Sequence, residues 1–332
     1  MPIGVAAAFS NHANLLSSSE RQQIVTGDFS QVTAENEMKM SYHYSNGSLD
    51  FSGPDRIIDF AMQNNLSVHG HALVWHPTYQ LPEWADASNG NFKQDFATHV
   101  TKVAEHFAGK IESWDVVNEA LEEGDTMYRQ ADSVFYQVYD GPEYIHEAFR
   151  LARQADPNAL LYYNDYNTEN NGIKTERLIA LLRDLTDNQV PIDGVGFQMH
   201  VMMEWPPISD IRSSMQQVVD EFPNLMVKIT ELDVRINNVY DNNTANDASE
   251  LTPALEQQQG QRYYEIIRAY LEVVPPGRRG GVTVWGVIDP DSWYSEHSGN
   301  GVTVSDWPLI WDANFNKKAA YFSIEEALTT HQ

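Results

Sequence analysis

The chain has 332 residues, and its 47 acidic against 21 basic side chains give a formal net charge of −26 at pH 7. This excess of acid excludes nucleic acids and anionic membrane surfaces as partners, because both attract clustered Lys and Arg. Cysteine is absent, which excludes disulfides and thiolate metal sites. No apolar run approaches the ~20 residues of a membrane span, and no basic segment followed by an apolar one opens the chain. We expect a soluble protein from which any export signal has been removed.

Strand-like apolar runs alternate with segments of helical period along the chain. The predicted strands are 3–9, 31–34, 66–75, 111–119, 159–165, 194–200, 226–232 and 282–286, and the predicted helices are 17–27, 54–64, 92–108, 142–154, 173–188, 208–221, 254–274 and 317–328. This alternation predicts an α/β fold, a parallel sheet closed into a (β/α)8 TIM barrel, with a doubly wound open sheet as the alternative. No glycine-rich dinucleotide fingerprint follows the first strand, which disfavours the open sheet. Since no linker interrupts the pattern, we expect a single catalytic domain over residues 1–332.

Polar and aromatic residues gather at the predicted strand ends, which form the active-site face of such a barrel. Glutamate, asparagine and lysine follow the second strand, and histidine and tryptophan end the third. Acids, amides and histidine end the fourth, sixth and seventh strands, and tryptophans lie at and beyond the eighth. Flat apolar rings with polar side chains around them suit the two faces of a sugar ring. The sequence therefore predicts a sugar-binding cleft.

Two glutamates, Glu119 and Glu231, close short Val/Ile-rich runs. A carboxylate is costly to bury unless it is paired or hydrogen-bonded. The position of these two glutamates in apolar runs therefore indicates a functional or structural role. Paired carboxylates that face one cleft are what the hydrolysis of a glycosidic bond requires. We therefore predict that these two residues form a catalytic pair.

The predicted partners of Glu231 are Asp233 and His200. Alternation along a strand places Glu231 and Asp233 on one face, and His200 ends the neighbouring strand. We expect Asp233 to hold His200 and His200 to donate to Glu231, which keeps Glu231 ionised as a nucleophile. The alternative is a network of charges that only fixes packing.

Glu119 has Asn118 as its neighbour, and alternation would send the two side chains to opposite faces. A bulge or strand-end turn is needed if both are to serve one substrate. With it, Asn118 could bind a sugar hydroxyl while Glu119 protonates the leaving oxygen, with a pKa raised by apolar surroundings and by the charge of Glu231. The alternative is that the Asn-Glu pair only caps the next helix.

His69 and His71 share one face of a predicted strand, a spacing that is also used for metal ligands. A metal-dependent barrel hydrolase is therefore the rival enzyme class. It is disfavoured because the other strand ends offer Gln, Asn and Trp and no further ligand set. Histidine is expected here to orient hydroxyls or carboxylates.

Six segments together resemble glycoside hydrolase family 10 endo-β-1,4-xylanases, and within that family the catalytic domains of Cellvibrio-type bacterial enzymes. They are Trp114-Asp-Val-Val-Asn-Glu119-Ala, Ile229-Thr-Glu231-Leu-Asp233, His71-Ala-Leu-Val-Trp75-His76, Tyr163-Asn-Asp-Tyr-Asn167, Asp193-Gly-Val-Gly-Phe-Gln198-Met-His200 and Thr283-Val-Trp285-Gly. The resemblance spans nearly the whole chain. Any one motif would be weak evidence, but the set is specific.

The resemblance implies a barrel that cleaves internal β-1,4-xylosidic bonds of xylan with retention and without a cofactor. Glu119 would be the general acid/base and Glu231 the nucleophile, supported by Asn118, His200 and Asp233. The residues expected to bind sugar, the first five of them on the glycone side, are Glu35, Asn36, Lys39, His71, Trp75, Gln198, Trp285 and Trp293. The expected partners are xylan and xylo-oligosaccharides, and the protein is expected to be a monomer that is secreted or held at the cell surface.

Two features depart from this pattern or add to it. Met40 stands where the family often has tryptophan, which changes one wall of the cleft. The segment 237–247 is rich in the oxygen ligands that Ca²⁺ prefers and resembles a calcium-binding loop of Cellvibrio-type enzymes. The expected ligands of this structural calcium are Asn238, Asp241, Asn246 and Asp247. The alternative is an ordinary Asn/Asp-rich turn.

Two further functional alternatives stay open. A catalytically silent carbohydrate-binding barrel would keep the tryptophans but lose one of the glutamates, and both are present. Another β-1,4-glycanase, such as a cellulase, would use the same chemistry. Its substrate differs by one CH₂OH group on each sugar, so selectivity depends on how closely Glu35, Lys39 and Trp285 approach the ring.

Overall fold

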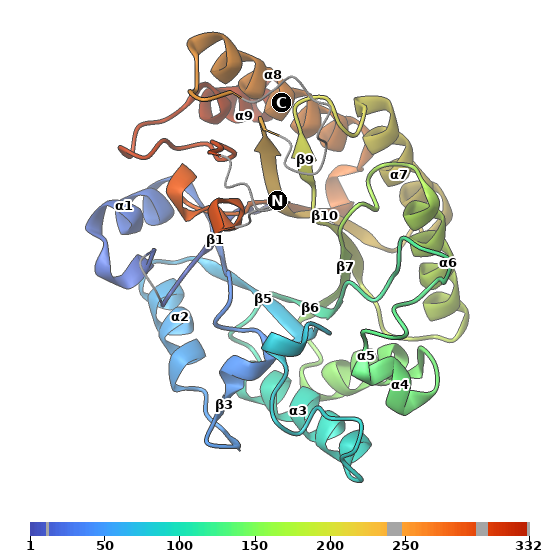
Figure 1. Ribbon diagram of the computed structural model, residues 1–332. Helices are drawn as coiled ribbons and strands as arrows, with labels where there is room; N and C mark the ends of the chain where they lie inside the picture. The colour runs from blue at the N-terminus through green and yellow to red at the C-terminus, as the bar shows by residue number, and fades with distance from the viewer. Residues whose placement is uncertain (11–12, 238–247, 297–304, 331–332) are drawn as a thin grey trace.

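The computed structural model describes residues 1–10, 13–237, 248–296 and 305–330 (Figure 1). Its strands are β1 (Ile3–Ala7), β2 (Gln31–Ala34), β3 (Tyr44–Ser45), β4 (Ser48–Leu49), β5 (Ser67–Val74), β6 (Ser113–Asn118), β7 (Leu160–Asp165), β8 (Gly194–Phe197), β9 (His200–Met202), β10 (Met226–Arg235) and β11 (Arg279–Val284). Its α-helices are α1 (Ser19–Asp28), α2 (Ser52–Gln63), α3 (Phe92–Phe107), α4 (Val134–Tyr139), α5 (Glu143–Ala155), α6 (Ile173–Asp187), α7 (Ile208–Glu221), α8 (Pro253–Val273) and α9 (Ala319–Thr329).

Most of the strands form a closed parallel barrel, and the helices lie around it (Figure 1). β3 and β4 pair with each other as a separate antiparallel sheet. The order around the barrel is β1, β2, β5, β6, β7, β8, β10 and β11, and β11 pairs in parallel with both β10 and β1. Helices follow each of these strands in the chain. The predicted (β/α)8 barrel is confirmed, and the open-sheet alternative is wrong. Within the described ranges, no helix is long and apolar enough to cross a membrane.

The structure differs from the sequence prediction at several element boundaries and in short elements that were not predicted, such as β3 and β4. The predicted strand 194–200 is interrupted, because Met199 has a φ of 63° and the chain resumes as β9, which pairs with the C-terminal part of β10. β10 itself runs on to Arg235 instead of ending at residue 232. Helix α4 was not predicted, since its 6 residues are too few to display a helical period.

The outward-facing side chains of the strands are apolar and pack against the helices. Trp114 of β6 is fully buried, and its ring lies 6.1 Å from that of Phe107 of α3. Gly70 of β5 pairs with Trp114, and a β-carbon there would lie 2.2 Å from the Trp114 ring. Glycine between His69 and His71 is therefore required by this close approach.

The barrel interior, in contrast, is polar. Lys228 of β10 donates to Gln31 of β2 over 2.6 Å, although the two strands are not neighbours, so this hydrogen bond crosses the interior. Asp115 of β6 accepts from His71 at 2.9 Å and lies 3.1 Å from His69 Nε2. All five side chains are buried. Since buried polar groups are tolerated only when they are hydrogen-bonded, these contacts fix the register of the strands that carry the active-site residues.

His99 of α3 provides a test of the pH dependence of stability. Its Nε2 lies 2.9 Å from the Leu73 carbonyl and its Nδ1 lies 3.1 Å from the Tyr44 hydroxyl, an arrangement that suits the neutral ring. Burial lowers the pKa of His99 to about 4, although the bond to Leu73 opposes the shift. The unfolded chain therefore takes up this proton first as the pH falls, and the stabilising contribution present above about pH 6.5 is lost on the way down to pH 4.

We accordingly expect the free energy of unfolding of the parent, relative to a His99→Phe variant, to fall by roughly 3 kcal/mol between pH 6.5 and pH 4. Denaturant titrations of both proteins across this range measure the difference. The comparison cancels all other titrating groups, and a difference that stays constant with pH would show that His99 is not held neutral.

Candidate active site

Glu119 and Glu231 lie at the carboxyl ends of barrel strands that are separated by β7 and β8. Glu119 directly follows β6, and Glu231 is part of β10. Glu231 is only 4% exposed and its backbone N–H donates to the Gln198 carbonyl, whereas Glu119 is half-buried. The fold therefore brings the two predicted carboxylates to the same end of the barrel.

The strand-end irregularity expected at Glu119 is present. Glu119 has a φ of 58°, in the left-handed region, and the pairing of β6 with β7 shifts register between Asp115 and Val117. The Glu119 N–H donates to the Asn164 carbonyl of β7 at 2.9 Å. This turn places the side chains of Asn118 and Glu119 on the same side of the chain, where the Asn118 amide donates to Glu119 Oε1 at 3.3 Å.

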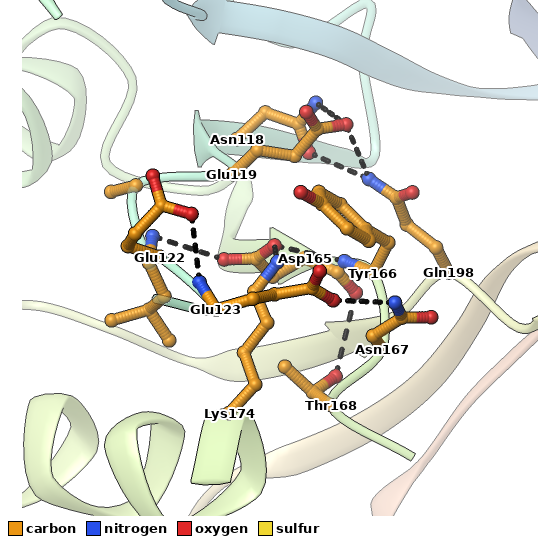
Figure 2. Close-up of polar contacts among 12 residues, drawn as sticks. Asn118, Glu119, Glu122, Glu123, Asp165, Tyr166, Asn167, Thr168, Lys174 and Gln198 are labelled. Carbon is orange, nitrogen blue, oxygen red and sulfur yellow. Dashed lines mark hydrogen bonds and ion pairs between the residues drawn. The ribbon is translucent and has the colours of Figure 1, made fainter. Parts of the chain in front are cut away.

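The Glu119 carboxyl has a second donor, the Gln198 amide, at 2.9 Å (Figure 2). Burial raises the pKa of Glu119, but the hydrogen bond from Gln198 and the positive charge of Lys174 are among the effects that outweigh it, so the pKa lies below its ordinary value. The expectation of a raised pKa is therefore wrong for the free protein. The physical reason is that amide donors bind a carboxylate better than a protonated acid.

The predicted chain of Asp233, His200 and Glu231 is confirmed. His200 Nδ1 lies 2.8 Å from Asp233 Oδ2, and its Nε2 lies 3.3 Å from Glu231 Oε2. Burial lowers the pKa of His200, but the charges and hydrogen bonds of Asp233 and Glu231 raise it more, to about 10. His200 is therefore an imidazolium at neutral pH, and its positive charge lies beside the Glu231 carboxyl group.

Asn164 connects the two glutamates and was not among the predicted site residues. Its amide nitrogen donates to Glu231 Oε1 at 2.7 Å and to Asn118 Oδ1 at 3.0 Å, and Asn118 in turn donates to Glu119. The Thr230 hydroxyl donates to Asn164 Oδ1 at 2.6 Å, which fixes the orientation of the amide. The only sequence signal was its place in the polar end of the fifth predicted strand.

The two tryptophans predicted to bind sugar at and beyond the last strand, Trp285 and Trp293, lie beside His200. The Trp293 ring lies 5.0 Å from the His200 ring, and its indole N–H donates to Asp233 at 2.9 Å. The Trp285 ring lies 6.4 Å from His200 and 5.2 Å from His71. Trp285 thus lies between His71 and His200, and Trp293 packs on His200.

The residues predicted to bind sugar after β2 form one group with Trp75. The Lys39 ammonium donates to Asn36 at 3.0 Å and lies 4.5 Å from the centre of the Trp75 ring. Burial lowers the pKa of Lys39, and the charges of Glu231 and Glu35 oppose this shift. The Lys39 ammonium is therefore stabilised by the negative charges of both Glu231 and Glu35.

Met40 explains how the chain does without a tryptophan at this position. Its side chain is fully buried, and its sulfur accepts a hydrogen bond from the Trp75 backbone N–H at 3.4 Å. Met40 therefore supports Trp75 from below and does not form a wall of the site.

The two segments considered as metal ligands, the disfavoured His-x-His pair and the predicted calcium loop, have different outcomes. His69 and His71 both contact Asp115, so the His-x-His spacing serves a buried network. In the described part of the chain, no group of three or more His, Asp or Glu side chains is arranged to hold a metal ion. The predicted calcium ligands, Asn238, Asp241, Asn246 and Asp247, lie outside the described residues.

The charge on His200 can be tested by replacing its stronger partner. In an Asp233→Asn variant we expect the pKa of His200 to fall from about 10 by roughly 1 to 3 pH units, since an adjacent carboxylate favours the charged ring to about that extent. NMR titration of ¹⁵N-histidine-labelled protein measures this pKa directly. A His200→Gln variant identifies the resonance, and an unchanged midpoint would mean that Asp233 does not control the charge.

Comparison with known proteins gives a consistent result. A model of glycosyl hydrolase family 10 matches residues 2–327. Endo-1,4-beta-xylanase A of Cellvibrio japonicus is 55% identical over 343 aligned positions, which cover 99% of this chain and 55% of the relative, so the chain spans about half the length of that protein. Among solved structures, the catalytic core of xylanase A has a TM-score of 0.95 at 55% identity and covers 99% of this chain and 98% of its own.

A second structure, a mutant of xylanase A from P fluorescens subsp. cellulosa in complex with xylopentaose, also has a TM-score of 0.95 at 55% identity, with 99% of this chain and 98% of that chain covered. The family match covers nearly every residue, and it includes both glutamates and the strands that carry them. The chain belongs to glycosyl hydrolase family 10.

Proposed function

We propose that residues 1–332 form a single catalytic domain that hydrolyses internal β-1,4-xylosidic bonds of xylan with retention of configuration. The observation that carries this proposal is the pair Glu119 and Glu231, connected through the amides of Asn118 and Asn164 at one end of the barrel. Only two amide side chains separate the two carboxylates, so both can act on the same sugar carbon. This arrangement suits a double displacement. The similarity to a solved complex with xylopentaose supports xylan as the substrate.

In the first step, Glu231 attacks the anomeric carbon while Glu119 gives its proton to the departing sugar oxygen. A covalent glycosyl ester forms on Glu231, and the aglycone leaves as an alcohol. His200, charged at neutral pH and held by Asp233, orients the Glu231 carboxylate for the attack. Asn164 donates to the other carboxylate oxygen, so the negative charge of Glu231 is fixed from two sides.

In the second step, Glu119 removes a proton from water, the water oxygen attacks the same carbon, and Glu231 is released as a carboxylate. Two inversions give net retention. The charge of Glu231 is absent in the ester, and its absence lowers the pKa of Glu119 still further. The donors around Glu119 thus favour the carboxylate that the second step needs.

The substrate is bound by residues around this pair. We propose that these residues are Glu35, Asn36, Lys39, His71, Trp75, Gln198, Trp285 and Trp293. The half-buried members of the set, which remain reachable from outside, are Glu35, Asn36, Trp75 and Trp293. Indole faces pack on the apolar face of a pyranose, while carboxylate, amide and ammonium groups bind its hydroxyls.

The proposal also covers the oligomeric state, the location, the partners and the cofactors of the enzyme. We propose a monomer, secreted or held at the cell surface, which acts on xylan and xylo-oligosaccharides and on neither nucleic acid nor membrane. Catalysis needs no cofactor, and a structural Ca²⁺ at 238–247 is proposed on ligand chemistry alone. The melting temperature before and after exhaustive chelation tests the calcium, and no change would count against it.

Product analysis tests the proposed activity. The protein is incubated with linear xylan, branched xylan and carboxymethyl cellulose, and the released sugars are separated over time. We expect a ladder of xylo-oligosaccharides from xylan and little release from the cellulose. Predominant release from carboxymethyl cellulose would favour a cellulase, and no release from any polymer would favour a binding barrel.

A further inference from the structure

Three consecutive backbone N–H groups that begin at Glu119 are each held by a residue of β7. The Glu119 N–H donates to the Asn164 carbonyl at 2.9 Å. The next N–H, of Ala120, donates to the Tyr163 hydroxyl at 3.0 Å, and that of Leu121 donates to Asp165 Oδ2 at 3.3 Å. Three neighbouring residues on one strand therefore hold the turn that carries the catalytic carboxyl.

The two side-chain acceptors are themselves fixed. The Tyr163 hydroxyl donates to Asp165 Oδ2 at 2.5 Å. The Lys174 ammonium lies 2.7 Å from Asp165 Oδ1 (Figure 2). Asp165 also accepts from the Tyr166 N–H at 2.9 Å. Tyr163, Asp165 and Lys174 are all fully buried or nearly so. A carboxylate with this many partners has one stable orientation, so the acceptors offered to Ala120 and Leu121 do not move.

The carbonyl of the same turn is held from the opposite side. Arg129 Nε donates to the Glu119 carbonyl at 2.9 Å, and its Nη2 donates to the Tyr166 hydroxyl at 2.6 Å. Tyr166 follows Asp165 directly, so this contact also leads back to the end of β7. The backbone N–H and the backbone carbonyl of Glu119 are thus both connected to one short segment of the chain, 164–166.

We propose that Tyr163 and Asp165 are positioning residues for Glu119, and that they act through the backbone of residues 119–121. A left-handed conformation is disfavoured for a residue with a β-carbon and persists only where the surroundings impose it. The contacts from β7 impose this conformation on Glu119. They thereby determine the position of the Glu119 carboxyl group relative to the sugar oxygen that it protonates. This inference rests on the proposed role of Glu119 as acid/base.

Tyr163→Phe is the variant that tests this proposal, because it removes one hydroxyl and keeps the buried ring. Tyr162→Phe is the matched control. Tyr162 is the preceding buried tyrosine, and its hydroxyl lies 3.4 Å from the Met226 sulfur near the start of β10, away from Glu119. Both proteins are compared with the parent and with Glu119→Ala.

The measurement is kcat/KM for two aryl β-xylobiosides, one with a phenyl and one with a 2,4-dinitrophenyl leaving group. Dinitrophenolate leaves without a proton, whereas phenolate needs the acid, so only the phenyl substrate senses the position of Glu119. For Tyr163→Phe we expect a loss of about 10²-fold with phenyl, the effect of a displacement of about 1 Å, and less than about 3-fold with dinitrophenyl. Tyr162→Phe should keep the parent kcat/KM for both substrates.

Each outcome decides one question. Equal losses on both substrates, or none, in Tyr163→Phe would overturn the positioning role, provided that Glu119→Ala loses the phenyl substrate selectively. If Glu119→Ala shows no such selectivity, the proposed function of Glu119 fails instead. If Tyr163→Phe does not fold, as judged by its melting temperature, Asp165→Asn is measured on the same two substrates, and the same selective loss is required.

Discussion

Replacing Glu231 with alanine is expected to reduce the release of reducing sugar from xylan by about 10⁵- to 10⁶-fold, the scale of loss when a covalent nucleophile is removed. No neighbouring group can take its place, because Asn164 and His200 contact Glu231 as donors and Asp233 is held by His200 and Trp293. The rate is measured with protein free of parent contamination, over hours and at high enzyme concentration.

The control is Glu112→Ala, which removes a glutamate just before β6, at the opposite end of the barrel. The Glu112 carboxylate accepts from Gln31, and within the part of the chain that the structure describes it has no hydrogen bond or ion pair with the residues predicted for the site. This variant should keep the parent rate on xylan. A Glu231→Ala protein that retained more than about a hundredth of the parent rate, with melting temperatures unchanged, would remove Glu231 from the nucleophile role.

Replacing Glu119 with alanine is expected to slow the hydrolysis of xylan by about 10²- to 10⁴-fold, the contribution of a positioned acid/base. The sugar oxygen of xylan is a poor leaving group and depends on the proton of Glu119. The second step also slows, because water then has no base. The initial rates of sugar release by parent and variant measure the loss.

Sodium azide provides the control for Glu119. The anion needs no base, and in Glu119→Ala it can react with the glycosyl ester in the space that the carboxylate has left. We expect azide to accelerate turnover of a 2,4-dinitrophenyl xylobioside by this variant and to yield a β-xylosyl azide. The parent should not respond. An absence of rescue, or an α-linked azide, would contradict the role given to Glu119.

The barrel and the position of the catalytic pair could be predicted because they depend on local pattern. Alternating strand and helix periods specify the fold, and strand ends meet at one face in any (β/α)8 barrel. The neighbours Asn118 and Glu119 even required a turn, which the φ of 58° at Glu119 supplies. Likewise, Glu231 and Asp233 share a face by alternation alone, so His200 between them was predictable.

The remaining features depend on contacts between residues far apart in the sequence. Asn164 bridges the glutamates because β7 lies beside β6 and its side chain reaches across to β10, which periodicity does not reveal. The lowered pKa of Glu119 follows from the donor Gln198, a residue that had been expected to bind sugar. His69 and His71 were expected to orient hydroxyls or carboxylates, but the sequence did not identify Asp115 as the carboxylate that both contact.

In the proposed mechanism, Glu231 forms a covalent bond to the sugar, and Glu119 is the general acid in the first step and the general base in the second. The most direct test uses a 2,4-dinitrophenyl xylobioside that carries fluorine at carbon 2 of the reacting sugar. Fluorine destabilises the positive charge of both transition states, and the dinitrophenolate keeps the first step fast, so the ester accumulates.

The protein is then analysed by mass spectrometry, intact and after digestion. We expect the mass to increase by one fluoroxylobiosyl group, located on the peptide that contains Glu231. Release of dinitrophenolate without any such adduct, or an adduct on the peptide that contains Glu119, would contradict this mechanism.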